Sequence, residues 1–161
     1  MLSHWQALFL NPRAEKKVAD VCRAHGIPFY LPLQTLTRIH QRRKVTVQMP
    51  LFPGYLFAAV APDDKLKLLQ TNHVLRFLVP HRPLSLLRDL VQLRRALLAD
   101  PSLRPVQALS RGRRVRIVNG PFQGMEGMVS RLSGPMRVVI TVEMIGMGVA
   151  VNAETDQVEP L

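Results

Sequence analysis

The sequence predicts an α+β protein in which an N-terminal α/β sandwich with an antiparallel sheet and three helices precedes a small five-stranded β-barrel. Three observations support this. Apolar residues recur at alternating strand and helix spacings up to about residue 99. Residues 100–110 contain two prolines and no apolar period. After them, short Val-rich runs are separated by glycines. We therefore expect an N-terminal domain over 1–99, a linker over 100–110 and a barrel over 111–161.

The first domain opens with a strand over residues 5–10. Asn11 is suited to cap the helix that follows, with Pro12 just inside it, and Gly26 ends that helix near residue 25. The apolar residues of the helix fall at spacings of three and four, which predicts one buried face formed by Ala14, Val18, Val21 and Cys22.

The rest of the first domain alternates strands with two more helices. Strands are expected over 29–33, 35–39, 45–49, 55–60 and 74–79, with the polar stretch 40–44 at a hairpin tip. Pro62 begins the second helix with acids in its first turn, where the helix dipole favours them. Ser85 is suited to cap the third helix.

The last fifty residues have a different pattern. Short β-rich segments at 115–118, 127–129, 137–142 and 149–151 are separated by glycine turns. Closure into a barrel would remove their exposed edges. The richness in Val, Ile and Thr predicts a constitutive barrel that does not refold into helices.

The net charge of +11 is unevenly distributed along the chain. Residues 1–110 hold 16 Lys and Arg against 6 Asp and Glu, whereas residues 111–161 hold 6 against 5. The first part is therefore the candidate for contact with a polyanion such as nucleic acid. Composition alone equally allows scattered surface cations that only keep the protein soluble.

Sequence features point to a reducing, cytoplasmic location. No run of 18 apolar residues occurs, and the first residues lack the pattern of a signal peptide. The single cysteine, Cys22, has no partner for an internal disulfide and lies among apolar residues. We therefore expect a cytoplasmic monomer that does not associate with membranes.

Catalytic motifs are missing from the sequence. The five histidines show no metal-ligand spacing, and there is no nucleophile elbow, paired-carboxylate motif or phosphate-binding loop. The sequence predicts a binding protein with no catalytic residue, no metal and no cofactor.

Residues 112–129 contain the most specific motif of the second domain. Asn119 and Gly120 suit a turn with positive φ, Phe122 offers an anchor for a small core, and Gly124 and Gly127 permit tight curvature. This segment resembles the KOW motif of NusG-type factors and some ribosomal proteins. We therefore interpret these glycines as architectural.

Residues 50–57 read Pro-Leu-Phe-Pro-Gly-Tyr-Leu-Phe, and alternation along the strand places Tyr55 and Phe57 on one face. This segment resembles the hallmark of the N-terminal (NGN) domain of the NusG/RfaH family, whose apolar cavity holds the clamp helices of the RNA polymerase beta-prime subunit. Trp5, the first helix and the KOW segment follow in the order of the family, so the resemblance covers essentially the whole chain.

The resemblance implies a polymerase-facing patch. Tyr55 is the strongest candidate, since tyrosine combines large apolar area with a polar end. The alternative is that these residues are ordinary core residues of a sheet, and we favour that alternative for Phe9 and Phe77. The candidates are Phe9, Phe52, Pro53, Gly54, Tyr55, Phe57 and Phe77.

The resemblance also implies contact with the exposed non-template DNA strand. Lys and Arg would neutralise phosphates, while Asn and His would hydrogen-bond to base edges. For each residue a solvated surface role is an equal alternative. The candidates are Arg13, Lys16, Lys17, Arg23, His25, Asn72 and His73, together with Arg42, Arg43 and Lys44 at the hairpin tip.

The implied function is transcription elongation or antitermination by reduced pausing or termination. The short N-terminal tail and the form of residues 11–15 favour an operon-specific paralog over a housekeeping NusG-type general factor. Residues 64–67 do not match the segment that contacts the beta subunit in RfaH, so that contact stays open. The barrel would bind a small-subunit ribosomal protein or the termination factor Rho. An RNA-binding or ribosome-associated KOW protein is the alternative from another class.

Overall fold

The structure is a computed structural model that describes residues 4–108, 111–130 and 135–161. By its internal contacts the chain divides into two compact units. The first comprises residues 1–33 and 50–87, and the second comprises residues 34–49 and 88–161.

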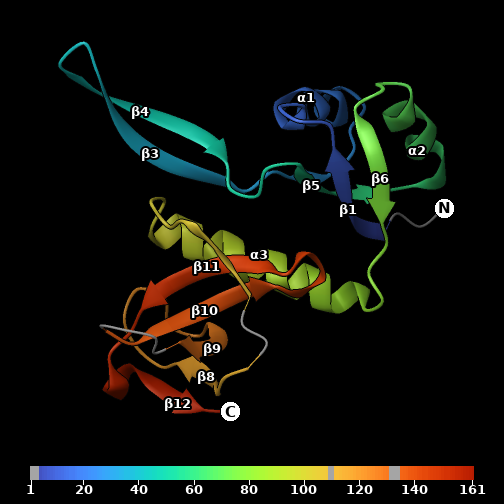
Figure 1. Cartoon of the computed structure of the whole chain (residues 1–161). Coiled ribbons are helices and arrows are strands. Elements are labelled where there is room, and N and C mark those ends of the chain that lie inside the picture. Colours follow the sequence, from blue (N-terminus) through green and yellow to red (C-terminus); the bar gives the residue numbers. More distant parts are fainter. Residues whose placement is uncertain (1–3, 109–110, 131–134) are drawn as a thin grey trace. The chain divides into compact units, whose positions relative to one another are not determined.

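A four-stranded antiparallel sheet forms the centre of the first unit (Figure 1). Its strand order is β2-β5-β1-β6. The strands are β1 (His4–Leu10), β2 (Phe29–Tyr30), β5 (Tyr55–Val60) and β6 (Val74–Leu78). The central strands β1 and β5 are the most apolar, which fits their position between two neighbours.

Helices α1 (Glu15–Ala24) and α2 (Pro62–Leu69) belong to the same unit. A cluster of buried side chains from α1, β1, β5 and α2 fills the space at one face of the sheet, and it includes Leu8, Val18 and Leu56. Ala14, Val18 and Cys22 are buried, and Val21 packs against the cluster, so the expected apolar face of the first helix is confirmed.

The N-termini of the first and third helices differ from the sequence expectation. α1 begins at Glu15, its N-cap residue is Ala14 with no side-chain cap, and Asn11 therefore does not cap it. Asn11 is used instead to join two loops, as described below. α2 begins at Pro62 as predicted, and the Asp64 carboxylate accepts a hydrogen bond from the Ala61 N–H at 3.2 Å.

The second unit contains a hairpin and a long helix. The hairpin consists of β3 (Leu33–His40) and β4 (Arg43–Pro50), which pair only with each other in the described sheets. Helix α3 (Pro83–Ala99) extends into this unit and begins at Pro83. Ser85 therefore lies inside the first turn of α3 and is not its cap, because proline with its fixed φ already begins the helix.

A six-stranded antiparallel sheet completes the second unit. Five strands lie in 111–161 as predicted, and residues 105–107 of the expected linker add a sixth strand that pairs with β11 (Met147–Asn152). The last two linker residues, 109–110, lie outside the described residues. From one edge of the sheet to the other, the strands are β12 (Val158–Pro160), β8 (Arg114–Ile117), β9 (Glu126–Ser130), β10 (Arg137–Val142), β11 (Met147–Asn152) and β7 (Pro105–Gln107). Two short 3-10 helices lie at Glu143–Ile145 and Thr155–Gln157.

The predicted α+β class, with three helices and antiparallel sheets, is confirmed. Within the described part of the chain, no helix is long and apolar enough to cross a membrane.

Candidate functional site

Three loops of the first unit meet at the end of β1. The Leu10 N–H donates to the Gly54 carbonyl oxygen at 2.8 Å, and the Asn11 N–H donates to the His73 carbonyl oxygen at 2.9 Å. The Asn11 side chain donates through Nδ2 to the Asn72 carbonyl oxygen, also at 2.9 Å. The loop before α1, the turn before β5 and the turn after α2 are thus joined by hydrogen bonds.

Glu15 provides a further link between two of these loops. It is 6% exposed in the first turn of α1, and its Oε1 accepts a hydrogen bond from the Gly54 N–H at 3.0 Å. A carboxylate is favoured there by the helix dipole, and the bond satisfies a buried backbone donor. Glu15 therefore fixes the turn that leads into Tyr55.

Gly54 has a conformation that few other residues would adopt. Its φ is +86°, and a Cβ atom at this position would lie 3.3 Å from the Phe9 ring. Glycine avoids both the strain and the close contact. The turn can therefore pack tightly under Phe9.

Phe9 and Tyr55 form an aromatic pair on the sheet. They are register partners across β1 and β5, and their ring centroids lie 5.4 Å apart. Because Leu8 and Leu56 belong to the cluster beside α1, alternation places Phe9 and Tyr55 on the opposite face. Both residues are half-buried, so this face offers partly exposed aromatic area.

The other members of the predicted polymerase patch lie in different environments. Phe52 and Phe57 are buried, with Phe57 on the same face as Tyr55, while Pro53 is exposed. Phe77 packs against the cluster on the α1 face, and the Lys65 ammonium lies 5.1 Å from its ring centroid. The structure thus brings Phe9, Gly54 and Tyr55 together and places Phe77 on the other side of the sheet.

The predicted nucleic-acid residues separate into groups. Arg13 is exposed in the loop that Asn11 joins to Asn72 and His73, so these residues share one region. Arg13 and Asn72 both have left-handed φ values of 63° and 61°. Such strain in non-glycine residues is concentrated at functional sites.

The remaining candidates on α1 lie near its two ends. Lys16 and Lys17 are exposed near the start of the helix. At its far end, Arg23 forms an ion pair with Asp20 at 2.7 Å and lies 5.3 Å from the centroid of the Phe29 ring, and His25 is exposed at the C-cap. Arg23 is therefore already engaged within the protein.

The sequence expectation did not include Arg76, Asn11 or Glu15 as site residues. Arg76 is exposed and is the register partner of Phe9 across β1 and β6. Its charge within an otherwise apolar strand is the feature that marks it in the sequence. No comparable feature marks Asn11 or Glu15, since both residue types are common at helix starts.

The glycines of the KOW-like segment have structural roles in the second unit. Gly120 and Gly124 have positive φ values of 91° and 88°. A Cβ on Gly127 would collide with the Val139 carbonyl oxygen of the neighbouring strand. Phe122 is half-buried.

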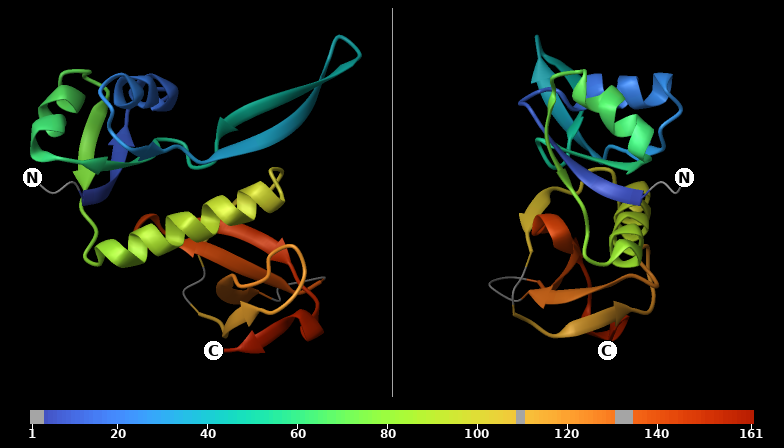
Figure 2. Two further views of the ribbon diagram at one scale, coloured as in Figure 1. Left: turned by 180° about the vertical axis from the view of Figure 1, so that it is seen from behind. Right: turned by 90° about the vertical axis from the view of Figure 1, so that its right-hand side faces the viewer.

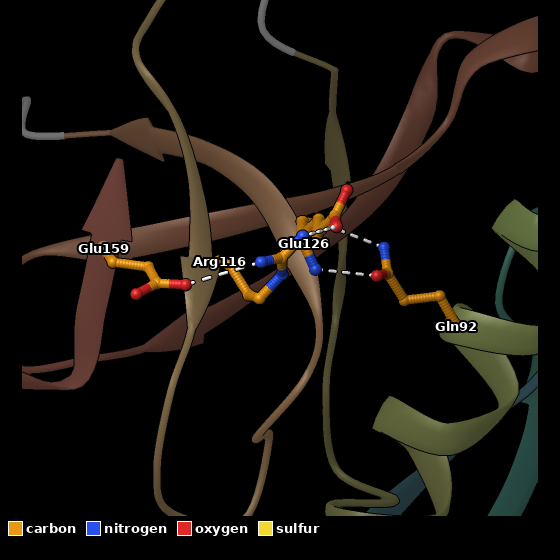
Figure 3. Close-up of polar contacts among 4 residues, drawn as sticks. All are labelled: Gln92, Arg116, Glu126 and Glu159. Carbon is orange, nitrogen blue, oxygen red and sulfur yellow. Dashed lines mark hydrogen bonds and ion pairs between the residues drawn. The ribbon is translucent and has the colours of Figure 1, made fainter. Parts of the chain in front are cut away.

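Polar contacts tie α3 to strand β9 within the second unit (Figure 3). The Gln92 side chain donates to the Glu126 carbonyl oxygen at 2.8 Å and accepts from the Glu126 N–H at 2.7 Å. Arg116 lies between the carboxylates of Glu126 and Glu159, at 2.9 and 3.4 Å. The amide of Gln92 thus completes the backbone hydrogen bonding of β9 at Glu126, as a neighbouring strand would.

A further contact supports the same connection. The Asp89 carboxylate accepts a hydrogen bond from the Glu143 N–H at 3.1 Å. Burial raises the pKa of Asp89, and this hydrogen bond opposes the rise because it favours the ionised form.

The His, Cys, Asp and Glu side chains of the described part of the chain are dispersed. There, no cluster of three or more His, Cys, Asp or Glu side chains could hold a metal ion. Cys22 is buried, and burial, with a smaller effect of the Asp64 charge, raises the pKa of its thiol to about 11.

Comparison with known proteins shows the family of this chain. A family model described as "Transcription termination factor nusG" matches residues 3–93, which is more than half of the chain. The structure described as "Domain interaction in Thermotoga maritima NusG" is similar over 97% of this chain and 96% of that chain, at 22% identity and a TM-score of 0.52. Two structures described as MjSpt4:Spt5 complexes also match over 98% of this chain. Conformation B is matched over 96% of its chain at 14% identity, and conformation A over 97% at 15% identity. Both have a TM-score of 0.31, which is too low to support an argument.

The family-model match over residues 3–93 defines a transcription factor of the elongation class. The chain belongs to the NusG family, which acts with the RNA polymerase machinery.

Proposed function

We propose that this protein is an operon-specific elongation and antitermination factor whose N-terminal domain binds the clamp helices of the polymerase beta-prime subunit and reduces pausing or termination. The observation that carries the proposal is the half-buried pair of Phe9 and Tyr55, held by the turn that Glu15 fixes. A rigid aromatic anchor loses little entropy on binding and is typical of interface hot spots.

The choice of an operon-specific role rests on the neighbouring polar loops. Arg13, Asn72 and His73 lie in loops joined through Asn11. Arginine neutralises phosphate, whereas asparagine and histidine donate to and accept from base edges. This combination favours recognition of an exposed non-template DNA strand. The C-terminal domain would then recruit a second partner, with a small-subunit ribosomal protein and Rho as the two candidates.

The binding test compares two single truncations. Tyr55→Ala should weaken co-purification with bacterial RNA polymerase at least tenfold, because it removes a hot-spot aromatic worth at least about 2 kcal/mol. Leu66→Ala is the matched control, since Leu66 is 61% exposed on α2 and lies outside the aromatic face. Phe57 is unsuitable for this test because it is fully buried. Equal binding of polymerase by the two folded variants would show that Tyr55 is not part of the interface and would contradict the proposed patch.

The functional test is in vitro transcription on two templates with the same strong pause, only one of which carries an upstream recognition sequence. A shortened pause on that template alone would support an operon-specific factor. An effect on both would indicate a general NusG-type factor. No effect and no polymerase binding would favour the ribosome-associated alternative.

A further inference from the structure

The six-stranded sheet of the second unit has an open cavity at one end of β8, β9 and β12. Its volume is about 460 Å³, which is within the usual range for ligand pockets. Exposure of its lining increases from a buried floor to an exposed rim, so an apolar group can enter it from solvent. The apolar lining residues are Val115 and Met136, which are buried, Val129 and Val158, which are half-buried, and Pro160, which is exposed.

The register of the strands explains why these side chains converge. Val115 is paired with Gly127 and with Pro160. Val129, two residues after Gly127, is paired with Val138. Paired residues, and residues two apart on one strand, share a face of a sheet. Because Val115 and Val138 are buried, this face is the inner one, and the cavity is a part of the interior that the strands leave open.

The cavity lies at the opposite end of β8 from the KOW-like turn. Val115 is near the start of β8, whereas the turn that contains Gly120 and Gly124 follows its end at Ile117. The cavity and the turn are therefore separate surfaces of the second unit.

One cation and one hydroxyl group complete the lining. They belong to Arg113 and Thr155, which are both exposed at the rim. Among the described residues, Arg113 forms no ion pair and no carboxylate lines the cavity. Glu159, the neighbour of Pro160 in sequence, pairs with Arg116 at 3.4 Å on the other face of the sheet. The cavity is thus complementary to an apolar ligand with a carboxylate, which arginine binds through two parallel N–H groups.

Strand β12 offers backbone hydrogen-bonding groups beside the cavity. It is an edge strand and pairs only with β8 in the described sheets (Figure 2, red, beside the C-terminus). The Val118 N–H donates to the Gln157 carbonyl oxygen, and the Leu161 N–H donates to the Arg114 carbonyl oxygen. Every second residue of β12 therefore directs its backbone groups to β8, while Val158, which lies between, directs its own away from β8. An extended chain can pair with Val158 there.

Together these features fit the carboxyl terminus of another polypeptide. The cavity accommodates an aliphatic last side chain, the Arg113 guanidinium binds the terminal carboxylate, and the Val158 backbone pairs with the chain as an added strand. A small aliphatic acid would use only the first two. We propose that the second unit binds the C-terminal segment of a protein partner whose last residue is a bulky aliphatic one such as leucine. This contact does not depend on polymerase binding by the first domain.

The first test measures binding of labelled peptides to the full chain by fluorescence anisotropy. The probe is fluorescein-Gly-Ser-Thr-Val-Leu with a free carboxylate. One control is the same peptide as its C-terminal amide, and the other ends in serine in place of leucine. Each control should bind at least about tenfold more weakly than the probe, because the first lacks the charge and the second lacks the apolar group. Equal binding of the probe and either control would overturn the proposal.

A charge substitution identifies the cation that binds the carboxylate. Arg113→Gln should weaken binding of the probe at least about tenfold and that of the amide less than about twofold, since the amide offers no charge. The matched control is Arg137→Gln, which removes an exposed cation of β10 that does not line the cavity. A similar loss in the control, or equal losses for the two peptides with the Arg113 variant, would refute the assignment.

A competition experiment distinguishes a polypeptide from a small acid. Isocaproate has the side chain and the carboxylate of leucine but no peptide backbone, so it cannot pair with β12. Displacing the probe should require a concentration of isocaproate at least about tenfold higher than that of the unlabelled peptide. Displacement at equal concentrations would show that the cavity is a site for small acids and would overturn the choice of a polypeptide.

Co-purification with RNA polymerase separates this contact from the clamp interaction. Arg113→Gln should leave polymerase binding unchanged while it weakens binding of the probe. Parallel loss of both would contradict a separate site in the second unit. If the probe fails to bind while polymerase binding is intact, this inference alone is refuted.

Discussion

The pairs β1–β5 and β3–β4 are both antiparallel, but the first has buried side chains on both faces and the second is exposed on both faces around its turn. Leu8 and Leu56 are buried on one face of the first pair, and Ala7 and Phe57 are buried on the other. In the second pair, ten consecutive residues around the turn are exposed. The two pairs thus share the same type of backbone hydrogen bonding, but the first forms part of the buried core and the second presents its side chains to solvent.

Sequence composition explains how the exposed pair keeps its extended form. Its strands contain β-branched residues at Thr37, Ile39, Val45, Thr46 and Val47, which favour extended backbone without burial. The buried pair gains its stability from packing. Substitutions should therefore affect folding in one pair and binding in the other.

The largest expected effect is in the buried pair. Leu8→Ala should lower the free energy of unfolding by about 2–5 kcal/mol, since it removes a fully buried side chain and leaves a cavity. Urea denaturation followed by circular dichroism would measure this. A loss below about 1 kcal/mol would contradict the packing described for this sheet.

Removal of the buried Glu15 carboxylate, which lies at the end of the same sheet, should cause the next largest loss in the free energy of unfolding. Glu15→Ala leaves the buried Gly54 N–H without its acceptor and should cost about 1–3 kcal/mol. Glu15→Gln keeps an acceptor oxygen and should cost less in the same denaturation measurement. Equal losses for the two variants would assign the effect to charge and not to the hydrogen bond.

A smaller loss of stability is expected from a substitution in the polar loops that Asn11 joins. Asn11→Ala removes one side-chain hydrogen bond to Asn72 and should lower stability by about 0.5–1.5 kcal/mol. Thermal unfolding would measure the change, with Asn152→Ala on an exposed position of β11 as the control. If the loops are a DNA-recognition site, the Asn11 variant should also lose template preference in transcription. An unchanged template preference would show that these loops do not take part in DNA recognition.

The smallest effect on folding should come from the exposed pair. Ile39→Ala should change the free energy of unfolding by less than about 0.5 kcal/mol, because the side chain is 77% exposed. The same urea measurement applies. A loss comparable with that of Leu8→Ala would mean that the ribbon is packed and would remove the contrast between the two pairs.

The sequence predicted the elements whose pattern is local. The spacing of Val18 and Cys22 predicted the buried face of α1, and the polar stretch around Arg42 predicted the hairpin tip, because burial and turn formation follow from neighbouring residues. Features that depend on partners distant in sequence were not predicted. Asn11 reads as a helix cap, and only the fold shows that its side chain bonds to Asn72, 61 residues away.

The same limit applies to strand β7 and to the aromatic residues. Pro105 reads as part of a linker, since proline lacks an N–H, yet at the sheet edge that donor is not needed. Alternation correctly placed Tyr55 and Phe57 on one face, but it does not reveal that Phe57 is buried while Tyr55 stays half-buried. The extent of burial depends on what packs against the sheet.

The burial of Cys22 has a practical consequence for spectroscopy. It is the only cysteine of the chain, it is 0% exposed, and the pKa of its thiol is raised to about 11, so at neutral pH it stays protonated and unreactive. A thiol introduced by Gln41→Cys would then be the one that accepts a maleimide dye. The hairpin tip can thus carry a single fluorophore in otherwise wild-type protein, and energy transfer to labelled DNA would report the distance between the tip and the DNA.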